Sequence, residues 1–391
     1  MKCMRVTYIL SSPISTGGAT KSFLNLLDGI LCKDVSALVV LPEYGALCSL
    51  LESRGVKWRI IPFRFEAYPP CRSLTDFSLF IPRLVGRIGL NILARIRLIN
   101  LLEDFRPDII HTNVGPVKVG FSVAKKLKIP HIWHLREYQD LDFDIHPMPT
   151  MKSFKASLRN PNNYTIAITE ALSEYFSLDP LKSEVIYNGV LSENDSRFCS
   201  SKEPYFLFAG RIEKAKGIDT LIDVFVNFCQ LNTSHKLLVV GNAPDKKFLS
   251  RLTAYVSSKQ LDDRIVFLGE RSDLFDLMFK STAVIIPSLN EGFGRVTVEA
   301  MIHGCLVIGR NTGGTKEILN QGKSIGLPYD TSEELLHYLI TVPDNIESYF
   351  PMIKKAQLIA VDKYSTEQNI DKTWSLYCKI LNNNRHDNIF V

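Results

Sequence analysis

Short apolar runs alternate with longer amphipathic stretches along most of the chain. This alternation is typical of parallel β-sheets whose strands are separated in the sequence by covering helices. It predicts the α/β class, with two doubly wound Rossmann-like domains. The predicted strands are residues 5–10, 37–42, 57–62, 109–112, 131–134, 164–168 and 184–187 in the first half, and residues 205–209, 236–240, 265–268, 283–287 and 305–309 in the second.

A chain of 391 residues is long enough for two hydrophobic cores. Residues 191–204 are crowded with Asn, Asp, Ser and Glu, which predicts a linker. We therefore expect one domain over residues 1–190 and another over residues 205–362. The tail, residues 363–391, contains a predicted helix with an apolar stripe that could pack back across the linker onto the first domain.

The eight cysteines are scattered along the chain with no close pair. This spacing favours reduced thiols in a cytoplasmic protein over a disulfide framework or a zinc site. No apolar run approaches the length of a membrane span, and the apolar stretch near the N-terminus is too short for a signal peptide.

Arginines interrupt a dense apolar series over residues 79–102. A basic amphipathic helix of this kind can lie on an anionic membrane surface. An ordinary domain helix with its arginines in water explains the pattern equally well, so both interpretations stay open. Nucleic-acid binding is not expected, because no basic run with interleaved aromatic residues accompanies the arginines.

Two carboxylates, Glu291 and Glu299, bracket a glycine-rich turn between a predicted strand and a predicted helix over residues 296–302. Such a turn offers unpaired backbone N–H groups to an anion. Eight residues of helix separate two groups by roughly 12 Å, whereas retaining glycosidases hold their carboxyls about 5 Å apart. The pair therefore suits an elongated ligand with hydroxyls at both ends and phosphate between, such as a nucleotide sugar. A capping acid and a solvated helix residue are the plainer alternative.

Ligands in open α/β sheets collect where strands end. Gly17 and Gly18 follow the first predicted strand and would let the backbone approach a ligand closely. A Rossmann dinucleotide site is an alternative there, since Glu43 ends the second strand where a ribose-binding acid would lie. His134 also stands at a strand end, as either a catalytic or a buried core residue.

Arg211 and Lys216 flank a short loop after the first strand of the second half. A guanidinium fork and a mobile ammonium could converge on one diphosphate. They would stabilise a leaving nucleoside diphosphate as its charge builds. The alternative is a pair of solvated surface cations.

Together these motifs resemble the retaining glycosyltransferases of family 4, which have the GT-B fold of two facing Rossmann-like domains. The resemblance runs from residue 5 to about residue 320. Its carriers are Gly17-Gly18, His134, residues 187–190, the G-R-x4-K-G pattern from Gly210 to Gly217, residues 287–294, residues 299–301 and residues 312–314. Leu191 departs from the pattern, because the family often has an acid at that position.

The resemblance implies a role for each matched residue. Arg211 and Lys216 would hold the donor diphosphate, Glu299 the ribose hydroxyls, and Glu291 the donor sugar. His134 would bond the sugar near the reacting carbon, and Arg136 and Glu137 would lie on the acceptor side. The other donor-binding residues would be Gly17, Gly18, Asn188, Gly210, Gly292, Phe293, Gly294, Val296 and Thr297.

The resemblance also implies transfer with retention of configuration, without a bound metal or cofactor. The donor would be a UDP- or GDP-sugar, and the acceptor a glycan or lipid-linked glycan of bacterial polysaccharide biosynthesis. The enzyme would be cytoplasmic, or peripheral on the inner face of the cytoplasmic membrane. A sugar-nucleotide epimerase and a non-catalytic nucleotide-sugar-binding protein are the alternatives; the former needs acid/base carboxylates at one sugar carbon, which Glu291 and Glu299 cannot both supply.

Overall fold

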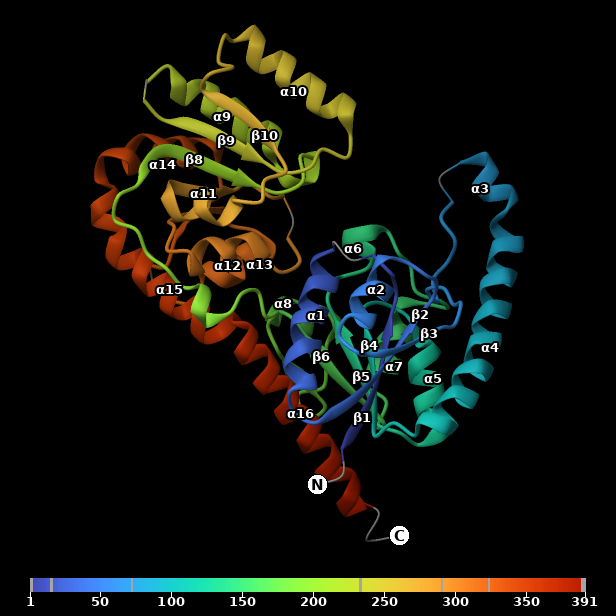
Figure 1. Cartoon of the computed structure of the whole chain (residues 1–391). Coiled ribbons are helices and arrows are strands. Elements are labelled where there is room, and N and C mark those ends of the chain that lie inside the picture. The colour runs from blue at the N-terminus through green and yellow to red at the C-terminus, as the bar shows by residue number, and fades with distance from the viewer. Residues whose placement is uncertain are drawn as a thin grey trace. The chain divides into compact units, whose positions relative to one another are not determined.

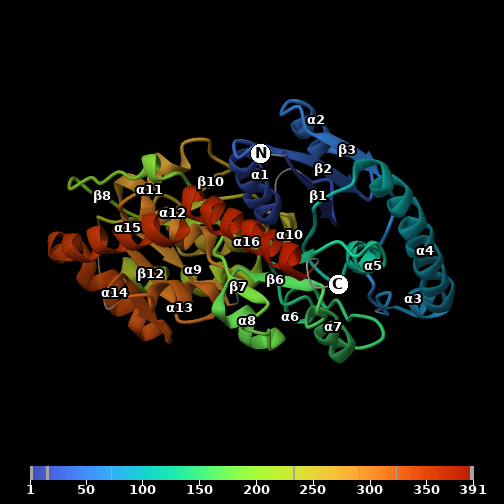
Figure 2. The same cartoon turned by 90° about the horizontal axis from the view of Figure 1, so that it is seen from below.

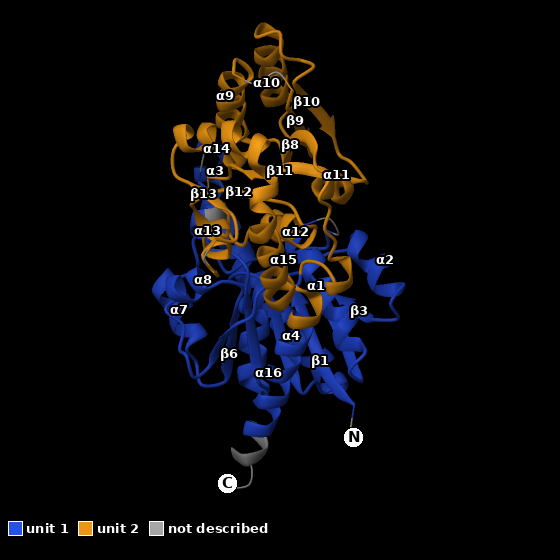
Figure 3. Ribbon diagram, turned by 90° about the vertical axis from the view of Figure 1, so that its left-hand side faces the viewer, with its two compact units in different colours: residues 1–189, 369–391 blue, residues 190–368 orange. Residues whose placement is uncertain are grey.

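The computed structural model describes residues 3–14, 17–71, 73–231, 234–289, 291–322 and 324–387. Residues 388–391, at the end of the predicted tail, lie outside the described residues. The chain divides into two compact units, one formed by Met1–Gly189 with Asn369–Val391 and the other by Val190–Gln368 (Figure 3). It therefore passes from one unit to the other twice.

The described residues of the first unit form a sheet of seven parallel strands in the order β3-β2-β1-β4-β5-β6-β7 (Figure 1). Most strand residues are buried, as expected for a parallel sheet covered on both faces. The seven predicted strands are confirmed, with ends shifted by at most two residues. The strands are β1 (Met4–Leu10), β2 (Val35–Leu41), β3 (Lys57–Ile60), β4 (Ile109–Asn113), β5 (His131–Leu135), β6 (Asn163–Ala167) and β7 (Ser183–Val185).

Two hydrophobic clusters cover the two faces of this sheet. Side chains of α1, α2 and α16 pack on one face, and side chains of α4 and α5 on the other. Leu376, Tyr377 and Ile380 of α16 are fully or almost fully buried in the first cluster, so the C-terminal helix completes the core of this unit. The helices are α1 (Gly18–Leu31), α2 (Ala46–Glu52), α3 (Leu74–Ser78), α4 (Phe80–Phe105), α5 (Lys118–Leu127), α6 (Asp140–Phe143), α7 (Met151–Leu158), α8 (Glu170–Phe176) and α16 (Thr366–Asp387).

The described residues of the second unit form a sheet of six parallel strands in the order β10-β9-β8-β11-β12-β13. β13 was not predicted from the sequence. It is three residues long and contains Pro328, so it lacks an apolar run. The strands are β8 (Glu203–Ala209), β9 (Lys236–Val240), β10 (Ile265–Gly269), β11 (Ser281–Ile286), β12 (Val307–Arg310) and β13 (Leu327–Tyr329).

β8 begins at Glu203, inside the segment predicted as a linker, which also contains a short 3-10 helix, η1 (Glu193–Asp195). A single large cluster of apolar side chains forms the core of this unit among its described residues. The remaining helices are η2 (Lys214–Lys216), α9 (Ile218–Cys229), α10 (Lys246–Ser258), α11 (Leu274–Lys280), α12 (Arg295–Ile302), α13 (Gly313–Leu319), α14 (Ser332–Asn345), η3 (Ile346–Tyr349) and α15 (Phe350–Tyr364).

Helix α4 lies on the outer side of the first unit, next to α5 (Figure 2). Its buried residues are Asn91, Ala94, Leu98 and Leu102, so only its second half packs into the core. Figure 1 shows α3 and the first turns of α4 standing away from the sheet of their unit. Among the described residues, no helix combines the length and the apolar character that crossing a membrane requires.

Candidate functional site

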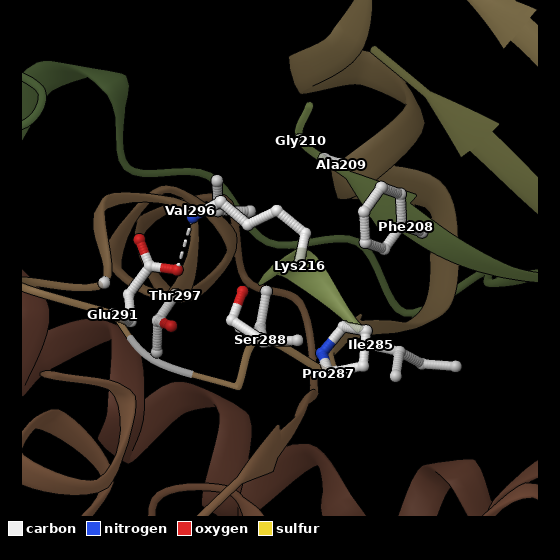
Figure 4. Close-up of a pocket in the computed structure, with 12 residues that line it drawn as sticks. Phe208, Ala209, Gly210, Lys216, Ile285, Pro287, Ser288, Glu291, Val296 and Thr297 are labelled. Atoms are coloured by element: carbon white, nitrogen blue, oxygen red, sulfur yellow. Dashed lines mark hydrogen bonds and ion pairs between the residues drawn. The ribbon is translucent and has the colours of Figure 1, made fainter. Parts of the chain in front are cut away.

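A pocket lies at the switch point of the second sheet, where β8 and β11 are neighbours and the strand order continues in opposite directions. It is lined by the ends of these two strands and by the loops that follow them (Figure 4). Its volume is only about 30 Å³, which is too small to enclose a nucleotide. Its lining residues are Phe208, Ala209, Gly210, Lys216, Ile285, Ile286, Pro287, Ser288, Glu291, Gly294, Val296 and Thr297.

Lys216 and Glu291 form an ion pair in this pocket, with Nζ 2.8 Å from Oε2. Both side chains are mostly withdrawn from water, which strengthens the attraction compared with an exposed pair. Lys216 comes from η2 after β8, and Glu291 from the loop after β11. The two predicted donor-binding groups therefore meet, although 75 residues separate them in the sequence.

Gly217 allows close contact between the loop after β8 and the loop after β11. Its φ of +66° is left-handed, and an added Cβ would lie 2.1 Å from the carbonyl oxygen of Pro287. Only glycine meets both conditions without strain. Next to this contact the N–H of Leu289 donates to the carbonyl of Ala215 over 3.0 Å, so the loops are joined through their backbones.

The Thr312-Gly313-Gly314 motif is hydrogen-bonded to the Glu291 loop. The Thr312 hydroxyl donates to the carbonyl of Ser288 over 3.0 Å, and the N–H of Gly314 donates to the carbonyl of Glu291 over 2.6 Å. A Cβ on Gly313 would lie 2.4 Å from that same carbonyl oxygen. The sequence alone indicated no role for this motif, and the structure shows that it positions the Glu291 loop.

Helix α12 starts directly after the loop, with Gly294 as its N-cap and no capping side chain. The first N–H groups of such a helix lack partners within the helix and attract an anion. Val296 and Thr297 of this first turn line the pocket. The geometry thus places an ammonium, a carboxylate and a helix N-terminus around one small depression.

Arg211, the second predicted diphosphate cation, does not line the pocket. Its side chain is 63% exposed and pairs with Glu213, with an N–O distance of 3.0 Å. Gly292 and Phe293 lie in the Glu291 loop, but the Phe293 ring turns inward against Tyr364. Only their backbones remain available for the predicted role.

Glu299 is 8% exposed and pairs with Arg295 one turn earlier, with Nε 2.8 Å from Oε1. Arg295 also donates to the carbonyl of Val190 over 2.9 Å. The structure therefore gives the buried carboxylate a structural partner that sequence reasoning missed, although the i, i+4 spacing was visible. Glu299 is not among the residues that line the pocket.

His134 is completely buried at the end of β5. Its Nδ1 lies 3.2 Å from Nε2 of His111, and the Nδ1 of His111 lies 2.6 Å from the Tyr377 hydroxyl, which donates to Tyr8 over 3.2 Å. The Nε2 of His134 has no hydrogen-bond partner among the described residues. Burial, aided by the charge of Arg136, holds the pKa values of both histidines well below the usual range, so both rings are neutral.

Arg136 and Asn188, predicted on the acceptor and donor sides, are bonded to each other through their side chains. Arg136 is buried, and its Nε also donates to Oδ1 of Asn113 over 2.7 Å. Glu137 is partly buried beside Arg136. Sequence reasoning missed Asn113, although its place at the end of a predicted strand was a usable signal.

Gly17 is the N-cap of α1, and Gly18 is its first residue. A Cβ on Gly18 would meet nothing within 4 Å, so space for close approach exists at this helix start. Among the described residues, no group of three or more His, Cys, Asp or Glu side chains is gathered as a metal site would require.

Residues 193–359 match the family model described as glycosyl transferases group 1. Over 323 residues the chain is 24% identical to alpha-monoglucosyldiacylglycerol synthase of Acholeplasma laidlawii, covering 74% of this chain and 79% of the relative. Over residues 193–359 the chain is thus similar to the glycosyl transferases of group 1.

Solved structures share the fold of this chain. HepE of Anabaena, solved in complex with UDP, has a TM-score of 0.78 and 20% identity, covering 96% of this chain and all of that one. A glycosyltransferase of Rickettsia africae has a TM-score of 0.76 and 17% identity, covering 97% and 99%. The predicted fold class of two doubly wound GT-B domains is thereby confirmed.

Proposed function

We propose that this glycosyltransferase moves a sugar from a UDP- or GDP-sugar to a glycan or lipid-linked glycan of bacterial polysaccharide biosynthesis, with retention of configuration and without a metal. The observation that supports the donor assignment is the Lys216–Glu291 ion pair. It lies in the loops that follow β8 and β11, beside the N-terminus of α12. HepE, which shares the fold, was solved with UDP-glucose.

In the proposed reaction the bond between the anomeric carbon and the diphosphate breaks, and a bond to an acceptor oxygen forms on the same face. The acceptor hydroxyl passes its proton to the departing diphosphate oxygen as its own oxygen attacks. Lys216 and the amides at the start of α12 would stabilise the negative charge that builds on the diphosphate. Glu291 would accept hydrogen bonds from the sugar hydroxyls, and Arg211 would swing from Glu213 to the phosphates.

Two relatives support a lipid-linked acceptor. The Acholeplasma relative is named as a diacylglycerol glycolipid synthase. A Campylobacter jejuni relative, 28% identical over 39% of this chain, is named as transferring N-acetylgalactosamine to an undecaprenol-diphosphate-linked sugar. Such acceptors reside in membranes, so we propose that residues 79–102 hold this cytoplasmic enzyme at the inner face of the cytoplasmic membrane. The exposed isoleucines of α4 support this contact.

The test is release of nucleoside diphosphate from a panel of UDP- and GDP-sugars, with and without glycan and lipid-linked acceptors. We expect release to require an acceptor and to persist in EDTA, and the anomeric proton coupling of the product to match that of the donor. Release of a rearranged sugar nucleotide without acceptor would identify an epimerase instead. Tight donor binding with no turnover across the whole panel would indicate a binding protein.

A further inference from the structure

A second cavity lies within the first unit, and none of the residues that line it was assigned to the donor or the acceptor above. It has a volume of about 400 Å³, within the range of small-molecule sites. One wall is a stripe of α4 formed by Leu84, Ile88 and Ile92, and the other is formed by Tyr68, Met148 and Pro149. The walls are apolar, so the cavity suits a hydrocarbon segment.

Hydrogen bonds fix the positions of the segments that form these walls. The Asn91 side chain of α4 accepts from the Arg64 N–H over 2.9 Å and donates to the Arg64 carbonyl over 3.0 Å. The Tyr68 hydroxyl donates to the Pro149 carbonyl over 3.1 Å, and the Met148 N–H to the Glu66 carbonyl over 2.8 Å. The loop that carries Arg64 and Tyr68 is thus bonded both to α4 and to the loop of Met148 and Pro149, so the two walls are held in fixed positions.

One end of the cavity is cationic. Lys118 is 9% exposed, and its Nζ donates to the Met148 carbonyl over 2.9 Å. Arg95 pairs with Glu66, while its buried Nε has no hydrogen-bond partner among the described residues. Burial lowers the pKa of Lys118, and the carboxylate of Glu66 counteracts this. Two cations face one carboxylate, and an anionic occupant would compensate the excess charge.

The α4 wall of the cavity continues into an exposed apolar stripe of the same helix. Ile88 and Ile92 belong both to the cavity wall and to this stripe, which continues to Ile81 and Val85 on one side and Ile96 on the other. These side chains are about half exposed or more and extend over roughly 22 Å of helix. A patch of this length on a surface marks an interaction site. Residues 77–102 contain four arginines and no acid. Arg83 and Arg95 pair with Asp76 and Glu66, and the other two, Arg87 and Arg97, favour an anionic partner.

We propose that this cavity binds one anionic phospholipid of the bilayer. Its phosphate lies at Lys118 and Arg95. One of its acyl chains lies between α4 and the loop of Met148 and Pro149 and continues along the Ile81–Ile96 stripe. The inference rests on the membrane contact proposed above and extends it, because it assigns a single lipid and a charge-selective head-group site. Surface adsorption alone needs neither the cavity nor Lys118.

The test uses water-soluble short-chain phosphatidylglycerol and, as a neutral comparison, short-chain phosphatidylcholine, with binding to the full chain followed by calorimetry. We expect saturable one-to-one binding of phosphatidylglycerol only. Lys118→Gln should weaken it about tenfold or more, since a hydrogen bond to a charged group is lost, and Lys118→Arg should retain it. Leu84→Trp should abolish binding by filling the cavity. Arg97→Gln, on the same helix but outside the cavity, should leave it unchanged.

Equal binding of both lipids, or an unchanged affinity in Lys118→Gln, would overturn the head-group site. Binding of a short polyprenyl diphosphate in place of phosphatidylglycerol would assign the cavity to the acceptor and overturn the phospholipid. Flotation with phosphatidylglycerol vesicles tests the membrane contact separately, and Arg97→Gln should weaken it. Nucleoside diphosphate release with a water-soluble acceptor tests the transferase itself, so the three failures are distinguishable.

Discussion

The ammonium of Lys216 and the carboxylate of Glu291 neutralise each other across the loops that follow β8 and β11. Each is the natural partner of a different part of a nucleotide sugar, the diphosphate for Lys216 and the sugar hydroxyls for Glu291. A bound donor would therefore exchange one internal ion pair for two new contacts. Several predictions about variants of this pocket depend on that exchange.

Lys216→Ala should lower kcat/KM by roughly a hundredfold or more, because one preorganised donor to the developing charge is removed. Lys214→Ala is the matched control, since Lys214 belongs to the same short 3-10 helix but is exposed. It should change the rate little. Steady-state kinetics with the best donor decide the matter, and equal losses in the two variants would contradict the role of Lys216.

Glu291→Gln should separate donor binding from turnover. The substitution releases Lys216 from its internal partner, so affinity for the free nucleoside diphosphate should rise or stay constant while transfer falls. Calorimetry with UDP and GDP measures the first effect and product formation the second. In a double-mutant cycle with Lys216→Met, the losses should be less than additive. Strict additivity would show that the pair does not act as a unit.

Arg295→Ala should destabilise the protein by about 3 kcal/mol, since it removes the ion-pair partner of the buried Glu299 carboxylate. Glu299→Ala should cost less, because Arg295 is only partly buried and keeps its hydrogen bond to the Val190 carbonyl. Urea unfolding measures this cost. Arg271→Ala breaks the exposed pair with Asp273 and should cost less than about 1 kcal/mol. If Glu299 also holds the ribose, its variant alone should bind nucleoside diphosphate more weakly. Equal affinity in the Arg295 and Glu299 variants would leave Glu299 with a structural role only.

Gly217→Ala should cost more stability than Gly269→Ala, although the two glycines have nearly the same left-handed φ, +66° and +67°. A Cβ on Gly269 would meet nothing within 4 Å, whereas a Cβ on Gly217 would press on the Pro287 carbonyl. The backbone strain common to both is about 1–2 kcal/mol. Thermal melts of the two variants give the difference, which we attribute to the contact between the loops. Donor binding should fall only in Gly217→Ala.

Acid should destabilise the first unit below about pH 6.5. Burial lowers the pKa of His131 to about 4, and holds the pKa values of His111 and His134 well below the usual range. The unfolded chain therefore binds more protons than the folded chain between these limits, so stability is complete above about pH 6.5 and falls as the pH drops towards 4. At about 1.4 kcal/mol per pKa unit, His131 alone contributes on the order of 3 kcal/mol.

Urea midpoints across this pH range, with fluorescence of the buried Trp133 as the probe, measure the effect. His131→Gln should flatten the dependence whatever its own stability, because the slope reports only the proton uptake. A slope unchanged by this substitution would place the acid sensitivity elsewhere.

The sequence predicted the fold well because buried parallel strands are continuous apolar runs, such as residues 205–209, that require no partner to be recognised. It predicted which motifs of the second unit lie at the pocket for the same reason, since each follows a strand. It could not choose between Arg211 and Lys216, because the direction of each side chain depends on the turn of η2. Nor could it foresee that His134 is linked through His111 to Tyr377, which lies 243 positions later in the chain than His134.

The position of α16 late in the chain affects how the first unit folds during translation. Residues 1–189 leave the ribosome long before Leu376, Tyr377 and Ile380, yet these three side chains complete the core of the same unit. Until α16 has been synthesised, the nascent first unit exposes the apolar face that these side chains cover, a state prone to aggregation. A shortened gene that stops before α16 would leave that face permanently bare, so recombinant production should keep the natural C-terminal helix intact.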